Sequence, residues 1–213
     1  MGAAVDGLEM LTVTTAATDR ALLTTAELRA AIGIDDASQD AALVTIGARV
    51  ASTIARLCRV AEAAPTPVTL RSEVLTEVFR LHCGAEELIL SRRPVTSITS
   101  IVADDVTLET TEYEVEAGSG LLFYLCDDYR TMWTAQKITV VYTAGWATVP
   151  DDLKLAASKL VGDIYHAGTR DPNLKRHQID GVGEREFWVS PASDPLASEE
   201  VMQLLSPYTN WTL

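Results

Sequence analysis

Ile138-Thr139-Val140-Val141-Tyr142-Thr143-Ala144-Gly145-Trp146, with Val149-Pro150-Asp151-Asp152 just after it, is the stretch in which the pattern changes from strand to helix. β-Branched and aromatic residues fill its first part, and these residue types favour strands. Proline is tolerated in the first turn of a helix, and the two aspartates lie near the positive end of the helix dipole. We therefore predict a strand over Lys137 to Tyr142 and a helix over Asp151 to Ala167.

The block from Val68 to Tyr142 has the pattern of a small all-β part. Short runs of β-branched and aromatic residues are separated by turn residues, and Gly118-Ser119-Gly120 predicts a hairpin turn because glycine adopts positive φ without steric cost. Six strands are expected, as in a small sandwich or barrel. They are Glu73 to Leu81, Glu87 to Leu90, Ser97 to Val102, Tyr113 to Glu116, Leu121 to Leu125 and Lys137 to Tyr142.

Helical patterns flank this block on both sides. Thr24 and Thr25 precede a run of good helix formers that ends at Gly33, which predicts a short helix. Apolar residues then recur at helical spacing from Asp40 to Val60, as in a long amphipathic helix. A last helix is expected over Leu196 to Leu205. The expected fold class is α+β, with a helical frame of long amphipathic helices and an inserted all-β subdomain.

The same patterns suggest how the chain is organised. We expect an N-terminal segment over residues 1–23, a helical part over 24–66, a β-rich insertion over 67–148, and a second helical part with a hairpin and a C-terminal tail over 149–213. The chain has 213 residues, of which 47% are hydrophobic, and this is enough to bury one sizeable core. The four parts are therefore expected to form one domain overall.

Composition excludes several classes of function. The longest apolar runs are far shorter than the roughly 20 residues that span a bilayer, so no membrane partner is expected. Met1 to Met10 lacks the basic flank and apolar stretch of a secretory signal. The net charge of −13 opposes sequence-specific binding of nucleic acid, which depends on Lys and Arg. An acidic wall can nevertheless serve DNA by repelling it from the lining of a passage.

The residues with reactive side chains do not form a recognisable active site. Cys58, Cys83 and Cys126 are scattered without metal-ligand spacing, and we interpret them as reduced core thiols. His82, His166 and His177 are far apart, and no motif of a hydrolase, metalloprotease or phosphate loop is present. We predict no catalytic residues, no cofactor and no metal, and we therefore expect that the chain is not an enzyme.

The order of parts resembles the head-tail connector, or adaptor, family of long-tailed phages and gene transfer agents. The resemblance is strongest in Ile138 to Trp146, with its Tyr-Thr-Ala-Gly-aromatic turn, and in Val149-Pro150 before a helix. Arg93-Pro94-Val95-Thr96-Ser97-Ile98 and the helix pair of Leu28 to Leu57 add to it. It extends over roughly Thr24 to Tyr208. The β insertion is longer than in the shortest members, which leaves the role of residues 68 to 146 open.

The resemblance implies a structural role in a virion. Such adaptors form a ring, usually of twelve copies, in the neck between head and tail, after assembly in the host cytoplasm. The implied partners are other copies of the chain, the portal protein above, a stopper or tail-terminator protein below, and passing double-stranded DNA without sequence-specific binding. A ring needs two different contact faces on each copy. The helices Asp40 to Val60 and Asp151 to Ala167 are expected to frame them.

Three sets of residues are candidates for contacts in such a particle. The tail aromatics could dock into a neighbour or the portal, or could fold back on their own subunit. A basic cluster could meet portal carboxylates or DNA, or could be a solvated loop. Two aspartate pairs could face the channel, although adjacent aspartates at strand ends usually form turns. These sets are Pro207, Tyr208, Trp211 and Leu213; Arg170, Lys175 and Arg176; and Asp104, Asp105, Asp127 and Asp128.

Other functions fit the sequence less closely. A stopper or tail-completion protein of the same neck shares the logic of ring formation and is the first alternative. A non-viral β-sandwich binding module is an alternative from a different class, and an enzyme is the third. Binding to a portal protein separates the adaptor from a sandwich module, because such a module has no reason to recognise a portal.

Overall fold

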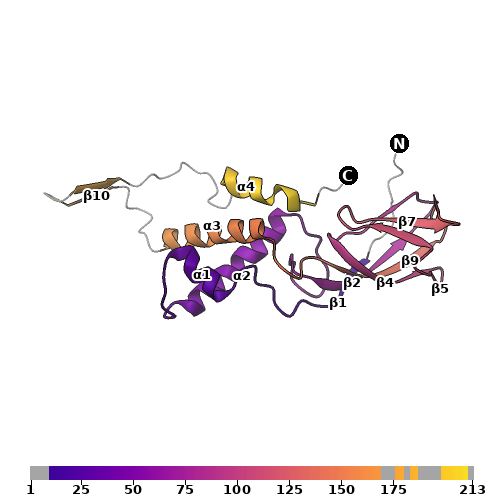
Figure 1. Ribbon diagram of the computed structural model, residues 1–213, viewed down its shortest axis with the longest axis horizontal. Helices are drawn as coiled ribbons and strands as arrows, with labels where there is room; N and C mark the ends of the chain where they lie inside the picture. Colours follow the sequence, from indigo (N-terminus) through magenta and orange to yellow (C-terminus); the bar gives the residue numbers. More distant parts are fainter. Residues whose placement is uncertain (1–9, 169–175, 180–182, 187–197, 211–213) are drawn as a thin grey trace. The chain divides into compact units, whose positions relative to one another are not determined.

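The computed structural model describes residues 10–168, 176–179, 183–186 and 198–210. These residues group into two compact units (Figure 1). The β unit comprises the described residues of Met1–Arg20, Ala55–Val149 and Asn210–Leu213. The helical unit comprises those of Ala21–Ile54 and Pro150–Thr209.

A five-stranded antiparallel sheet is the larger sheet of the β unit. Its strand order is β1-β2-β9-β4-β5, so β9 lies at the centre and pairs with β2 on one side and β4 on the other. Tyr142 of β9, for example, lies opposite Leu75 of β2 and Ile98 of β4. The strands are β1 (Met10–Thr15), β2 (Glu73–Arg80), β4 (Val95–Ala103), β5 (Val106–Thr107) and β9 (Lys137–Ala144).

A four-stranded antiparallel sheet completes the β unit. β7 lies between β3 and β6, and β8 also pairs with β7. The strands are β3 (Leu88–Ile89), β6 (Tyr113–Glu116), β7 (Leu121–Cys126) and β8 (Tyr129–Thr131). Side chains of both sheets share one apolar core, in which Trp133 is fully buried and its indole N–H donates to the carbonyl oxygen of Leu122 at 3.2 Å.

Four helices form most of the helical unit: α1 (Thr25–Ile32), α2 (Asp40–Leu57, whose last turn belongs to the β unit), α3 (Asp151–Gly168) and α4 (Glu199–Leu205). α1 begins with a capping box between Thr24 and Glu27 and ends at Gly33, which has φ of 74°. α3 packs against α1 and α4. A one-turn helix, η1 (Ser206–Tyr208), follows α4, and β10 (Arg176–Ile179) pairs with β11 (Gly183–Glu186) as a hairpin.

The expected helical frame of long amphipathic helices is wrong. In the described residues the helices are short, none exceeding 18 residues, and eleven strands form two antiparallel sheets and a hairpin. The fold is mixed α+β, but strands predominate. The physical reason lies partly in Met10–Thr15, which the sequence analysis assigned to the N-terminal segment and not to the β-rich part. Its β-branched run pairs with the distant strand β2, from Met10 opposite Val78 to Thr15 opposite Val74, and extends the larger sheet.

Candidate functional site

Two carboxylates lie inside the β unit, on the core-facing side of β2. Glu73 is 2% exposed and Glu77 is fully buried. Side chains alternate between the two faces of a strand, so these glutamates share their face with Leu75 and Phe79, which are also buried. Buried carboxylates are costly unless they are paired or hydrogen-bonded, and their partners therefore define the site.

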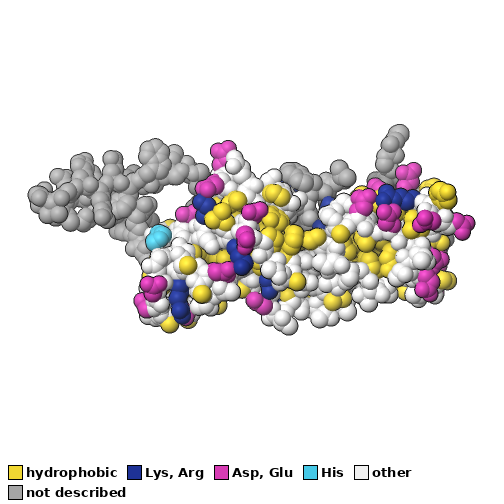
Figure 2. Space-filling model, in the orientation of Figure 1, with side chains coloured by type: hydrophobic (Ala, Val, Ile, Leu, Met, Phe, Trp, Pro, Cys, Tyr) yellow, Lys and Arg dark blue, Asp and Glu magenta, His cyan; other side chains and the backbone are white. Residues whose placement is uncertain are grey.

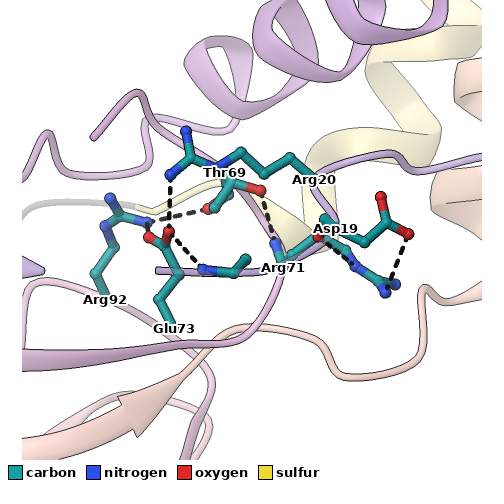
Figure 3. A network of polar contacts seen from close by, with 7 residues as sticks. Asp19, Arg20, Thr69, Arg71, Glu73 and Arg92 are labelled. Carbon is teal, nitrogen blue, oxygen red and sulfur yellow. Dashed lines mark hydrogen bonds and ion pairs between the residues drawn. The ribbon is translucent and has the colours of Figure 1, made fainter. Parts of the chain in front are cut away.

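Glu73 is held between two arginines (Figure 3). Its Oε1 accepts from the backbone N–H of Ala17 at 3.2 Å and from Nη2 of Arg20 at 3.4 Å. Its Oε2 lies 3.7 Å from Nη1 of Arg92, which in turn donates to the carbonyl oxygen of Thr69 at 3.0 Å. The N-terminal segment and the chain around Arg92 are thereby joined through one carboxylate.

Arg92 has few partners for a buried cation. It is 4% exposed, and its Nε and Nη2 have no hydrogen-bond partner among the described residues. Burial lowers the pKa of Arg92, and the charge of Glu73 opposes that shift. Because arginine keeps its proton in proteins, this burial makes Glu73 the counter-charge on which Arg92 depends.

A second ion pair extends the network to the surface of the β unit. Arg71 donates from Nε to the carbonyl oxygen of Asp19 at 3.3 Å, and its Nη2 lies 3.8 Å from the Asp19 carboxylate (Figure 3). The backbone N–H of Arg71 donates to the hydroxyl of Thr69 at 3.1 Å. Together with Glu73, this pair fixes the segment from Ala17 to Arg20 along the beginning of β2.

The turn after β9 lies beside the same part of the chain. The N–H of Trp146 donates to the carbonyl oxygen of Leu70 at 2.9 Å, and Ser72 donates back to Trp146 at 3.2 Å. Gly145 has φ of 99°, and a Cβ there would lie 2.5 Å from the carbonyl oxygen of Arg71. Only glycine fits this approach. The Tyr-Thr-Ala-Gly-aromatic turn of the connector resemblance therefore has a structural cause.

Glu77 has a full set of partners of its own. Tyr142 donates its hydroxyl to Oε2 at 2.7 Å, and Ser91 donates its N–H to the same oxygen at 3.1 Å and its hydroxyl to Oε1. Burial, together with the charge of Glu77, raises the pKa of Tyr142. The tyrosine therefore stays protonated and acts as a fixed donor. This arrangement fits a structural tie between β2, β9 and the loop after β3.

The surroundings of the network do not form a ligand site of ordinary size. A pocket of about 170 Å³ beside it is lined by residues that include Asp19, Arg71 and Trp146. Small-molecule sites usually measure roughly 300–1,000 Å³. Among the described residues there is no group of three or more His, Cys, Asp or Glu that could hold a metal ion, and no helix long and apolar enough to cross a membrane. The network joins segments of the chain.

The two aspartate pairs predicted from the sequence form two-residue hairpin turns. Asp104 and Asp105 connect β4 to β5, and Asp127 and Asp128 connect β7 to β8, each with positive φ. Two successive positive φ values match the turn that suits tight hairpins, and aspartate tolerates them. All four side chains are exposed, and acidic side chains gather at the end of the β unit that carries β5 (Figures 1 and 2).

One of these aspartates has a local task. The carboxylate of Asp104 accepts from the backbone N–H of Gln136 at 2.9 Å and of Lys137 at 2.8 Å. It thus fixes the beginning of β9 against the end of β4. The carboxylates of Asp105, Asp127 and Asp128 make no hydrogen bond or ion pair with the described residues, and their side chains are exposed to solvent.

The other predicted sites lie partly outside the described residues. Pro207 is exposed and Tyr208 is half-buried in η1, whereas Trp211 and Leu213 lie outside. Between them, Asn210 donates its backbone N–H to the carbonyl oxygen of Cys58 at 2.9 Å. The end of the described chain is therefore bound to the β unit. Of the basic cluster, Arg170 and Lys175 lie outside the described residues, and Arg176 begins β10, its side chain also lying outside.

Comparison with known proteins now places the chain in a class. The family model of the head completion protein matches residues 21–169, and the chain therefore belongs to the head completion protein family. This confirms the connector resemblance. The family is named for a structural task, in keeping with a sequence that lacks catalytic motifs. No curated protein matches the chain.

Solved structures share the fold from end to end. The chain is similar to one in the neck of an empty gene transfer agent particle computed with C6 symmetry, with TM-score 0.59 and 17% identity, covering 96% of this chain and 97% of that one. A chain in the native neck computed with C12 symmetry gives 0.56 and 19% over the same shares. A chain in the native gene transfer agent virion gives 0.56 and 18%, again over 96% and 97%.

Proposed function

We propose that this chain is a head-to-tail adaptor, which forms a ring of identical copies beneath the portal in the neck of a tailed phage or phage-like particle. The observation that carries the proposal is the end-to-end similarity to a chain of a neck computed with C12 symmetry, together with membership of the head completion protein family. The ring would have twelve copies. It would extend the DNA channel and offer a docking surface to the stopper or tail-terminator protein.

Reconstitution with the portal protein of the same particle tests this proposal. The full chain is mixed with portal rings, and the products are examined by native mass spectrometry and electron microscopy. We expect twelve copies bound to each portal ring. Binding that requires another neck protein to be present first would favour the alternative of a stopper or tail-completion protein. No binding under either condition would contradict both.

The tail is the proposed portal or neighbour contact. Pro207 is exposed, and aromatic residues such as Tyr208 and Trp211 are typical anchors of protein interfaces. Asn210 is already bound to Cys58, so a deletion that begins at Trp211 spares this contact. We expect removal of residues 211–213 to weaken attachment to the portal without lowering the temperature of unfolding. Attachment equal to that of the full chain would show that Trp211 and Leu213 are not part of the interface.

The aspartate turns are the proposed acidic lining of the channel. Asparagine tolerates positive φ, so Asp105, Asp127 and Asp128 can each be changed to Asn while the turns keep their shape. Asp104 is left intact because it binds the backbone of β9. We expect rings of the triple variant to retain double-stranded DNA more strongly at low salt. Neutralising Glu62, Glu86 and Glu87, which are also exposed in the β unit, is the matched control.

The basic cluster is the proposed second contact of the chain. Arg170, Lys175 and Arg176 could pair with portal carboxylates or with passing DNA. Replacing all three by Gln and measuring portal binding and DNA binding separately distinguishes these targets. If the triple variant keeps both portal binding and DNA binding, the cluster is a solvated segment without a partner in this interaction.

A further inference from the structure

The helical unit contains an exposed cation, Arg49, that has no counter-charge among the described side chains. Residues 21–54, 150–168 and 198–209 of this unit carry four Lys and Arg side chains, and three of them are in ion pairs: Arg29 with Asp40, Lys154 with Glu27 at 2.8 Å, and Lys159 with Glu200 at 2.9 Å. The fourth, Arg49 of α2, is exposed and makes no ion pair with any described residue. An exposed arginine without an ion pair in the described part of its own chain can pair with a carboxylate of another chain.

The face of α2 around Arg49 has the composition of a contact surface. The opposite side of the helix is its core stripe, with Leu43, Val50 and Ile54 buried. On the outward side Val44 is 51% exposed, and two of its neighbours at helical spacing, Ala41 and Ala48, are exposed alanines; a third, Asp40, is paired with Arg29. The outward residues are Ala41, Val44, Thr45, Ala48 and Arg49. An exposed apolar strip bordered by one arginine is typical of an interface centre, where arginine is enriched and acidic residues are depleted.

A complementary face lies at the beginning of α3 in the same unit. Asp151 and Asp152 are exposed and make no ion pair with any described residue, and Leu155, one turn later, is 48% exposed. The buried side of this helix carries Leu153 and Ala156. Here an apolar side chain is bordered by carboxylates, which is the reverse of the arrangement on α2. Figure 2 shows apolar side chains on the visible surface of the helical unit, with charged side chains beside them.

We propose that these two faces meet between neighbouring copies: the outward face of α2, with Val44 and Arg49, docks against the beginning of α3, with Asp152 and Leu155, of the next copy. The inference rests on the proposed ring and names the surfaces that close it. A ring requires each copy to present two different and complementary faces. The occupant is a second copy, because the same chain carries the acidic and apolar counterpart of the α2 face.

Charge exchange tests the pairing. Each contact joins Arg49 of one copy to Asp152 of the next, so Arg49→Glu breaks every contact in a ring, and Asp152→Arg in the same chain restores every one. We expect the single variant to bind its neighbour about tenfold more weakly, with unchanged circular dichroism, and the double variant to regain most of the loss. Native mass spectrometry of portal-bound rings at fixed ionic strength reads out the number of copies.

Cross-linking tests the same contact by distance. In a background in which Cys83 and Cys126 are serine, Val44→Cys and Leu155→Cys are combined in one chain. Oxidation of assembled rings then yields a ladder of covalent oligomers. Ala26→Cys with Leu155→Cys is the matched control, because Ala26 is an exposed residue of α1 in the same unit, and it yields no ladder.

The outcomes separate this inference from the proposed function. The inference is overturned, and the proposed ring is not, if rings form normally with Arg49→Glu and if assembled rings of the Val44→Cys, Leu155→Cys chain give no ladder. An Arg49→Glu variant that forms rings but fails to attach to the portal also overturns it, and assigns the α2 face to the portal. A wild-type chain that never forms rings on the portal overturns the proposed function itself.

Discussion

Arg92→Leu is the substitution that best tests the buried network. It removes a hydrogen bond of 3.0 Å to Thr69 and leaves Glu73, 2% exposed, without its buried counter-charge. Removing one partner of a buried pair costs roughly 3–5 kcal/mol. Because Arg20 still lies 3.4 Å from the same carboxylate, with 32% of its side chain exposed, we expect the lower end, about 3 kcal/mol. This corresponds to a fall of roughly 10 °C in the unfolding temperature of the β unit.

Urea unfolding followed by tryptophan fluorescence measures this loss. Trp133 is buried in the core of the β unit and reports its unfolding. Arg71→Leu is the matched control: its partner Asp19 is 63% exposed, so the loss should stay below about 1 kcal/mol. Glu73→Gln combined with Arg92→Leu removes the stranded charge and should recover part of the stability. Equal losses for the Arg71 and Arg92 variants would refute the argument from burial.

Three further predictions follow from single contacts. Tyr142→Phe leaves a buried oxygen of Glu77 without its 2.7 Å donor, and denaturant unfolding should show a loss of about 2 kcal/mol. Asp104→Ala removes the acceptor for two backbone amides at the start of β9, and the same assay should show a loss of about 1 kcal/mol, whereas Asp104→Asn should lose less. The hydrogen bond from Arg29 lowers the pKa of Asp40 below its ordinary value of 3.8. The stabilisation from this pair is therefore present above that value and is lost as the pH falls below it, so the stability gap between wild type and Arg29→Met should close in acid.

Local patterns predicted many of the elements correctly. The expected strand Glu73 to Leu81 agrees with β2 to within one residue, and the proline-and-aspartate signal placed the start of α3 at Asp151. Thr24 and Gly33 marked both ends of α1. These signals are local, because each depends only on residues that are close together in the sequence. The sequence alone is therefore enough to recognise them.

Long-range pairing could not be predicted in the same way. The pattern of Met10–Thr15 is compatible with an edge strand, but only its pairing with β2 makes it one. The predicted fold class was therefore wrong in making long helices the frame of the fold, because strands predominate. Helix patterns over 18 residues are conspicuous in a sequence, whereas two- and three-residue strands such as β5 and β8 have almost no pattern of their own.

The buried network was missed although a signal for it was present. Glu73 and Glu77 alternate with Leu75 and Phe79 at the two-residue period of a strand, which places both carboxylates on the core side. A glutamate on a core face requires a partner, and this requirement could have been stated from the sequence. The partners could not, because Arg20, Arg92 and Tyr142 come from three distant segments.

The position of β9 in the larger sheet has a consequence during translation. β9 is the central strand, yet it leaves the ribosome after every other strand of its sheet. Until Ala144 has been synthesised, β2 and β4 have no common neighbour, and both expose open edges in the nascent chain. A message cut short before this point therefore yields strands without the one that joins them, so the β unit can be completed only late in synthesis.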